Sequence, residues 1–515
     1  MDSTAEEERE GITAANLRRH VTLLEKRLLR NQQVRLEYPD DPERWVKSEV
    51  DLDEQIQLFR DICAQPELFE PLEELGGLRV LRDTLSHPNI DIAIATLTVL
   101  AELIDPESLV NLSGAERFLH ALHELSIHTP CVAALLQIDE GGGELDYEGV
   151  KSALELLENL LDLFPSVADD LGSNRDLVSF LLRRMKNSKT VEYDSNRVHA
   201  GEILCILLQN SEECLSLVGG PEIGGVEKLL RIVAVFRKKD PEGVEEEELV
   251  ENAFQCLCSL MLVSSNRISF GKLLGVNLLI RLIKERRSTY RLAITLLDYA
   301  LMDCPENCTL FVTGMGLKCV FSILMRKGVR TKAGSDEEKR EDEHVLGVLH
   351  SLCIHSSGTE LARVLNKFTE HKYEKLERLI ELHTTYTTLS RAAIKKLEQD
   401  SSSSSALKRK DPEEDYLERY EAGLSVCQLV DCILIRLYNM GNSNLSSCIL
   451  VLLHNKGVDI QDIYENVSGK NNDIHVTTHA DYLDHLDKSA VDTKESVDRL
   501  LKSFLTAASD SGLFV

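Results

Sequence analysis

The stretch 74–104, ELGGLRVLRDTLSHPNIDIAIATLTVLAELI, decides the fold. Apolar residues recur at intervals of three and four on both sides of a turn at 87–89, which is the spacing of two amphipathic helices. The proline in that turn ends the first helix, and the glycine pair Gly76 and Gly77 suits a tight turn before it. Two such helices cannot bury all of their apolar surface against each other. The pattern therefore predicts a unit that stacks on similar units in a solenoid.

The same pattern returns along the chain, each time after a glycine. The glycines that open the units are Gly77, Gly114, Gly172, Gly225, Gly275 and Gly316, and the steps between them are 37, 58, 53, 50 and 41 residues. Armadillo and HEAT units are about 40–47 residues long, so the longer steps require loop insertions. We assign these to 139–146, 186–194 and 238–247. No stretch has the alternation of a strand, so we expect an all-α, armadillo/HEAT-like superhelical solenoid of about six units and a terminal helical region over 74–399.

The two ends differ from the repeats. Residues 1–11 form an acidic tail that we expect to be disordered, and residues 12–73 form an N-terminal helical cap. In the cap, one helix runs over 12–36 until prolines end it, and a second begins with Ser48 or Asp51 as its N-cap. Residues 400–411 (DSSSSSALKRKD) read as a serine-rich flexible linker, and 412–515 as a C-terminal helical module. Within that module we expect a polar loop at 470–480 and a last helix near 491–508.

The composition excludes several classes of function. The formal charge is −28, from 58 basic and 86 acidic residues, so the chain should repel nucleic acid and attract basic protein segments. Three basic patches, at 183–186, 237–239 and 284–287, fall near helix ends and suit the helix dipole better than an RNA contact. The acidic start resembles no secretory signal, and no apolar run is long enough to span a membrane, so we expect no membrane contact.

The 13 cysteines have no framework spacing. Four of them, Cys205, Cys256, Cys353 and Cys427, fall on apolar helix faces, where a reduced cysteine acts as a small hydrophobic residue.

No motif indicates catalysis. His475, His479, Asp481 and His485 have a metal-like composition but lie in the predicted polar loop, so we expect no metal site there. The glycines at 141–143 have no Gly-Lys-Ser/Thr after them, and neither Gly-x-Ser-x-Gly nor His-Glu-x-x-His occurs. We therefore expect a non-enzyme without metal or cofactor.

Five unusual strings point to a family. They are RLLRNQQVRL with YPDDPERW in the cap, LCSLMLVSSNR at 257–267, LNKFTEHKYEKLERLIELH at 365–383 and YLERYEAGLSVCQLV at 416–430. These strings resemble the catenin-beta-like protein 1 family. They occur in the same order as in that family, from about residue 20 into the C-terminal module.

That resemblance implies a nuclear armadillo-repeat protein of the spliceosome, active in pre-mRNA splicing. It implies a place in the assembly built around the U-box ubiquitin ligase and its Myb-domain partner. It also implies that the protein binds basic, nuclear-localisation-like segments of splicing factors and has no catalytic chemistry. We expect a nuclear location, with which a cytoplasmic pool is compatible. A homodimer is also compatible with the resemblance. Family members carry a basic localisation cluster before the cap, which we expect to be missing here, leaving Lys408–Lys410 as the lysine-rich candidate.

The expected partner site is the groove lined by the last helix of each unit. Importin-type grooves use a tryptophan and, four residues later, an asparagine, but here Glu155 stands four residues before Asn159, and the single tryptophan, Trp45, lies in the cap. We therefore expect acids to hold basic segments by charge. The candidate partner-binding residues are Glu102, Glu155, Glu158, Asn159, Glu202, Glu251 and Asp298.

Three alternatives stay open at this point. The acids could simply be solvated helix faces. The chain could be a nuclear import adaptor, against which the missing tryptophan ladder argues, or a cytosolic armadillo signalling scaffold.

Overall fold

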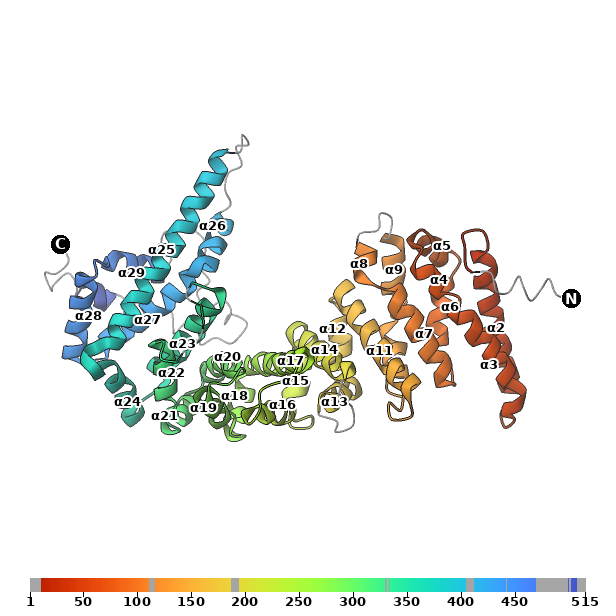
Figure 1. Ribbon diagram of the computed structural model, residues 1–515, viewed down its shortest axis with the longest axis horizontal. Helices are drawn as coiled ribbons and strands as arrows, with labels where there is room; N and C mark the ends of the chain where they lie inside the picture. The colour runs from red at the N-terminus through yellow and green to blue at the C-terminus, as the bar shows by residue number, and fades with distance from the viewer. Residues whose placement is uncertain are drawn as a thin grey trace. The chain divides into compact units, whose positions relative to one another are not determined.

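The structure, a computed structural model, describes residues 11–110, 116–186, 194–328, 331–332, 334–403, 412–440, 442–468, 499 and 502–506. Every regular element within these ranges is helical, which confirms the all-α prediction (Figure 1). The chain divides into two compact units. Unit 1 comprises Met1–Ile232 and Glu242–Ser259, and unit 2 comprises Val233–Pro241 and Leu260–Val515.

The N-terminal cap consists of helices α2 (Leu17–Glu37) and α3 (Pro42–Gln57), which pack against each other. The prediction that the second helix begins at Ser48 or Asp51 is wrong. Pro42 is its first residue, because proline lacks only an N–H that the first turn leaves unbonded, and its fixed φ suits a helix start. Ser48 instead lies buried inside the helix pair, where its hydroxyl accepts a hydrogen bond from Asn31 Nδ2 at 2.8 Å.

The deciding stretch folds as predicted. Helix α6 spans Gly77–Thr84, α7 spans Ile90–Leu103, and the side chain of Asn89 caps α7 by accepting a hydrogen bond from the Asp91 amide. Gly76 has a left-handed φ of 76°, and a Cβ at Gly77 would lie 2.3 Å from Leu72 Cδ1. Only glycine fits this turn without strain or clash.

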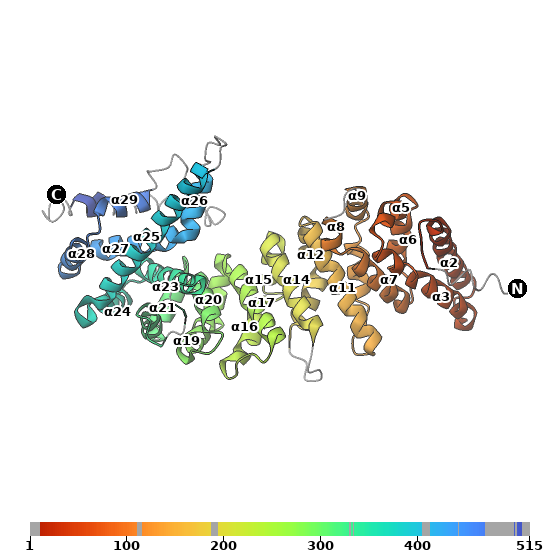
Figure 2. The same cartoon turned by 45° about the horizontal axis from the view of Figure 1, so that its top comes forward.

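The other helices of unit 1 follow in stacked groups. They are α4 (Arg60–Cys63), η1 (Pro66–Leu68), α5 (Phe69–Glu74), α8 (Pro106–Val110), α9 (Glu116–Glu124), α10 (His128–Leu135), α11 (Glu144–Leu163), α12 (Val167–Ser173), α13 (Arg175–Arg184), α14 (Ser195–Asn210), α15 (Glu212–Gly219) and α16 (Gly225–Val233), and α17 (Val244–Met261) runs on to the border with unit 2. Helices α3, α7, α11 and α14 pack one against the next (Figure 1 and Figure 2). This stacking of last helices is the solenoid arrangement that the repeat pattern predicts.

Only some of the glycines predicted to open a unit coincide with the start of a helix. Gly77, Gly225 and Gly275 each begin a helix, and Gly316 directly precedes one. Gly172 instead lies inside α12, and Gly114 lies outside the described residues. The predicted insertions at 139–146 and 238–247 run into the starts of α11 and α17, whereas 187–193 falls outside the described part of the chain.

Unit 2 continues the helical pattern. Its elements are η2 (Ala234–Arg237), α18 (Ser264–Lys272), α19 (Gly275–Glu285), α20 (Tyr290–Leu301), α21 (Pro305–Thr313), α22 (Leu317–Leu324), α23 (Asp336–His355), α24 (Gly358–Thr369), η3 (Glu370–Tyr373), α25 (Glu374–Ser403), α26 (Pro412–Arg419), η4 (Tyr420–Leu424), α27 (Ser425–Asn439), α28 (Ser443–Asn455) and α29 (Ile460–Ser468). Helices α20, α23 and α27 pack in succession, and α27 also contacts α25. Helix α27 of the predicted C-terminal module thus packs directly on helices α23 and α25 of the predicted repeat region.

Parts of the linker, the polar loop and the last helix that the sequence predicts near the C-terminus lie outside the described residues. Helix α25 extends to Ser403, so the first residues of the predicted linker are helical. The remainder of that linker, with Lys408–Lys410, lies outside the described residues, as do the loop at 470–480 and most of 491–508.

A π-helical turn, η4, joins α26 to α27. Within it Gly423 has a φ of 115°, and a Cβ there would lie 2.5 Å from Cδ1 of Tyr386. The Tyr386 hydroxyl donates a hydrogen bond to Asp342 Oδ2 at 2.9 Å, so this contact links α25 to α23. The glycine lets three helices approach closely at one point.

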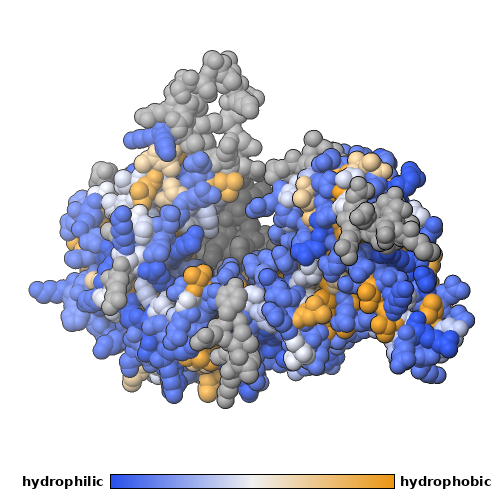
Figure 3. All heavy atoms as spheres, turned by 45° about the vertical axis from the view of Figure 1, so that its right-hand side comes forward, coloured by the Kyte–Doolittle hydropathy of each residue, from blue (hydrophilic) through white to orange (hydrophobic). Residues whose placement is uncertain are grey.

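The described helices bury a core of mainly leucine, isoleucine, valine, alanine and phenylalanine. On the face drawn in Figure 3, hydrophilic residues cover most of the surface and hydrophobic ones form small groups. Among the described helices, none alone is long and apolar enough to cross a membrane; Pro305–Thr313 and Leu317–Leu324 pass that test only as a pair bent by 89°.

Candidate functional site

Carboxylates from three neighbouring helices meet on one side of unit 1. We define the acidic cluster as Glu155, Glu158 and Asp162 of α11, Glu202 of α14 and Glu248 of α17. Glu158 and Asp162 are four residues apart and therefore share one helix face. Since α11 packs on α14, that face lies beside Glu202.

One histidine contacts the acidic cluster. His199 Nδ1 lies 3.1 Å from Glu158 Oε2, and His199 stands three residues before Glu202 on α14. The hydrogen bond to Glu158 raises the pKa of His199, although burial opposes the rise. Glu202, Glu155 and Glu158 add to the rise by their charge.

The carboxylates repel one another. Burial raises the pKa of Glu202, and the nearby charges of Glu158 and Glu248 raise it further. The pKa of Asp162 is also raised, first by burial and then by Glu158. Burial and the repulsion between neighbouring carboxylates together raise these two pKa values, and a positive charge placed nearby would lower them. A further cation at this place would therefore be attracted.

The remaining predicted site residues have other surroundings. Glu102 is bound by Arg60 of α4, whose Nε lies 3.0 Å from Oε2, and Asn159 Nδ2 donates to the Ala101 carbonyl at 3.2 Å. Glu251 is exposed on α17. Asp298 lies in unit 2, is 7% exposed and sits 3.1 Å from His344 Nδ1, so its carboxylate is already occupied.

The structure therefore brings Glu155, Glu158 and Glu202 together and leaves the others apart. Asp162, His199 and Glu248 were not among the site residues predicted from the sequence. The helical spacing from Glu158 to Asp162 could have shown the first. The other two contacts depend on how helices pack.

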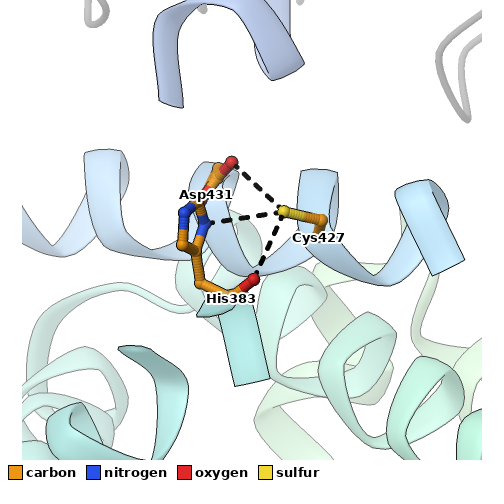
Figure 4. Close-up of side chains that lie close together, drawn as sticks. All are labelled: His383, Cys427 and Asp431. Carbon is orange, nitrogen blue, oxygen red and sulfur yellow. Dashed lines mark hydrogen bonds and ion pairs between the residues drawn. The ribbon is translucent and has the colours of Figure 1, made fainter. Parts of the chain in front are cut away.

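A second group of polar side chains is buried in unit 2. We call His383 of α25 with Cys427 and Asp431 of α27 the buried triad (Figure 4). His383 Nδ1 lies 2.6 Å from Asp431 Oδ1, and Cys427 Sγ lies 3.5 Å from the same nitrogen. Their side chains are almost wholly buried.

Two neighbours complete the surroundings of the buried triad. Asn466 Nδ2, from α29, lies 3.0 Å from Asp431 Oδ2 and 3.4 Å from Cys427 Sγ. The hydroxyl of Thr387 lies 3.1 Å from the same sulfur.

The buried triad does not have the geometry of a nucleophile with its base. A Cys-His-Asp nucleophile system needs the sulfur at one imidazole nitrogen and the carboxylate at the other, whereas here both face Nδ1. Burial raises the pKa of the Cys427 thiol well above its usual value, and Asp431 adds to the rise. Burial lowers the pKa of His383, but the charge of Asp431, its hydrogen bond to the imidazole and the charge of Asp462 together outweigh burial and leave that pKa raised.

Comparison with known proteins identifies the family. Residues 1–468 match the family described as "Catenin-beta-like, Arm-motif containing nuclear". The chain belongs to the catenin-beta-like family. Beta-catenin-like protein 1 of Homo sapiens is 33% identical over 454 residues, which cover 87% of this chain and 80% of the human protein. The Schizosaccharomyces pombe homolog is 32% identical over 386 residues, 74% of this chain and 66% of that protein.

A solved structure supports the fold alone. The crystal structure of SYS-1 aligns over 91% of this chain and 84% of its own, with a TM-score of 0.52 and 9% identity. The armadillo-type solenoid that the repeats predict is thus confirmed, and so is the family that the five strings indicate. As a member of the catenin-beta-like family, the chain is a nuclear armadillo-type protein-interaction scaffold, and its relatives bear the names of catenin-like proteins rather than of enzymes.

Proposed function

We propose that this catenin-beta-like chain is a non-enzymatic scaffold of the spliceosome that binds basic, nuclear-localisation-like segments of splicing factors. The place in pre-mRNA splicing, and the Myb-domain factor of the U-box ubiquitin-ligase complex as a partner, rest on the family resemblance. The acidic cluster of unit 1 supports the mode of binding. It is the observation that carries the proposal.

The cluster suits a lysine or arginine side chain. The Glu158 side chain is 23% exposed, so it can be reached from solvent while part of its hydration is already removed. Glu155 is exposed on α11, three residues before Glu158, and Glu248 is exposed on α17. A cation that enters here forms charge-assisted hydrogen bonds and relieves the mutual repulsion of the carboxylates.

The test measures binding of a lysine- and arginine-rich peptide to the full chain. The variant Glu158→Lys/Glu202→Lys reverses two charges in the cluster, and we expect it to weaken binding at least tenfold, which is about 1.4 kcal/mol. A matched control is Glu124→Lys/Glu213→Lys, which makes the same charge change at exposed positions of unit 1 outside the cluster. Binding should also fall as salt rises.

Equal losses in both double variants would show that only net charge matters, and an unchanged affinity in the cluster variant would refute the acidic cluster as the site. A pull-down from nuclear extract separates the alternatives. Recovery of splicing factors supports the splicing scaffold. Recovery of importin-beta-type carriers in their place would favour the import adaptor instead.

A further inference from the structure

We propose that the buried triad of His383, Cys427 and Asp431 is a binding site for one zinc ion. Its ligand atoms all lie within 4.8 Å of one another, and they come from two helices that pack together. Cysteine sulfur, histidine nitrogen and carboxylate oxygen are the atoms that bind zinc in proteins. Sulfur in such a set favours zinc over magnesium or calcium, which select oxygen ligands.

The helix geometry places the ligands on one side. Cys427 and Asp431 are four residues apart on α27 and therefore point the same way, toward the imidazole of His383 on α25 (Figure 4). A pair of ligands at this spacing on one helix, completed by a third from a neighbouring element, is a common way to hold a metal ion.

The distances suit a coordination tetrahedron. With zinc–sulfur and zinc–nitrogen bonds of about 2.3 and 2.0 Å, a sulfur–nitrogen edge is about 3.5 Å long. Cys427 Sγ lies 3.5 Å from His383 Nδ1 and 3.8 Å from Asp431 Oδ2. His383 Nδ1 and Asp431 Oδ1 are hydrogen-bonded at 2.6 Å. The two atoms must move apart by less than about 1 Å to admit the ion between them.

Asn466 faces the fourth position. Its carboxamide lies 3.4 Å from the sulfur and 3.0 Å from Asp431 Oδ2. Because the two ends of a carboxamide have nearly the same shape, a half-turn would present its oxygen to an ion. The Gln428 side chain, which donates to the Asn466 carbonyl at 3.0 Å, holds α29 in place.

Charge balances with and without the ion. Without it, a positively charged His383 and a negatively charged Asp431 cancel beside a neutral thiol. When Zn²⁺ binds, the imidazole and the thiol each release a proton, and the ion then faces one thiolate, one carboxylate and one neutral imidazole. The net charge is zero in both states, which a site this deeply buried requires. The ion would tie α25, α27 and α29 together.

The test begins with the full-length chain purified without chelator. We expect one zinc per chain by elemental analysis, and after chelation we expect Co²⁺ to produce thiolate-to-cobalt absorption in the near ultraviolet. Zinc added to the stripped protein should raise the melting temperature. Cys427→Ser should abolish the absorption, whereas Cys448→Ser, a cysteine on the neighbouring helix α28, should keep it.

A second control concerns the histidines at 475 and 479, which have a metal-like spacing in the sequence. Their double alanine variant should keep its zinc. Zinc that is lost from that variant and kept by Cys427→Ser would overturn the proposal. So would a wild-type chain with no retained zinc and no cobalt absorption, which would make the buried triad a hydrogen-bonded network only. The wild-type measurement stands even if a variant fails to fold.

Discussion

His199 Nδ1 lies 3.1 Å from Glu158 Oε2, and this contact places a titratable cation inside the acidic cluster of unit 1. The hydrogen bond raises the pKa of His199 above its usual value, so the histidine keeps its proton to a higher pH than a free one. While protonated, it partly neutralises the carboxylates that we propose bind a basic segment. The pair therefore makes binding depend on pH.

Binding of a basic peptide should strengthen as pH rises from 6 to 8. As pH rises through the raised pKa of His199, the histidine loses its proton and the cluster becomes more negative. One half-buried charge of this kind is worth up to about 1 kcal/mol, so we expect an increase of about two- to fivefold in affinity. Titration calorimetry at both pH values measures it. His199→Gln should flatten the dependence, and His120→Gln, at an exposed histidine of α9, should not. An equal slope in all three proteins would contradict the prediction.

The same pair affects stability with the opposite sign. Because the folded-state pKa of His199 is raised, its contribution is fully present below the unfolded pKa and is lost as pH rises through the folded pKa. We expect the urea midpoint of wild type to fall relative to that of Glu158→Gln as pH rises from 6 to 8. Chemical denaturation at the two pH values tests it. A gap between the two proteins that stays constant with pH would count against the pair.

The contact of Arg60 with Glu102 predicts a gain of binding. The guanidinium occupies a carboxylate that the sequence alone assigns to a partner. Arg60→Ala should free Glu102 and strengthen binding of the basic peptide about two- to threefold, with a stability change below about 1 kcal/mol because the pair is exposed. Arg117→Ala removes a comparable exposed arginine, which pairs with Glu70 and Glu74, and serves as the control. If neither variant changes the affinity, Glu102 is not part of the binding surface.

The features that the sequence revealed are those set by neighbours along the chain. The two helices around the turn at 87–89 follow from apolar spacing and an asparagine cap, which operate within a few residues. Pro42 misled the prediction because proline both ends one helix and favours the start of the next.

The contacts that decide the candidate sites join helices far apart in the sequence. His199 and Glu158 are separated by 41 residues, Arg60 and Glu102 by 42, and His383 and Asp431 by 48. Glu155, Glu158 and Glu202 could be predicted from their helix positions, but Glu248 and the counter-charges could not. These depend on the rotation of each helix about its axis as it packs.

Gly423 should tolerate no side chain. Its φ of 115° is unfavourable for alanine, and the new Cβ would meet the ring of Tyr386 at 2.5 Å. We expect Gly423→Ala to lower stability by about 2–4 kcal/mol, from backbone strain together with a clash. Gly457→Ala is the matched control, since its φ is 67° with open space around the added carbon, so it should cost only about 1 kcal/mol. Equal melting temperatures for the two variants would show that Tyr386 moves aside.

Arg326 holds together a set of buried carboxylates in unit 2. Its guanidinium lies 3.0 Å from Glu341 Oε2 and 2.9 Å from Asp342 Oδ1, and these side chains are only 1% and 5% exposed. Burial raises the pKa of Asp342, and the charge of Arg326 acts against that rise. Arg326→Ala would leave two buried carboxylates without their cation.

We expect this change to cost about 3–5 kcal/mol, because an unpaired buried charge must be protonated or reached by water. Arg231→Ala, which removes an exposed arginine paired with Glu227 on the same helix, should stay within about 0.5 kcal/mol. Urea denaturation of both variants measures the difference. Lowering the pH through the raised pKa of Asp342 should narrow the gap, since protonation of Asp342 removes the charge that Arg326 stabilises. A gap that does not change with pH would mean that Arg326 acts through packing rather than through its charge.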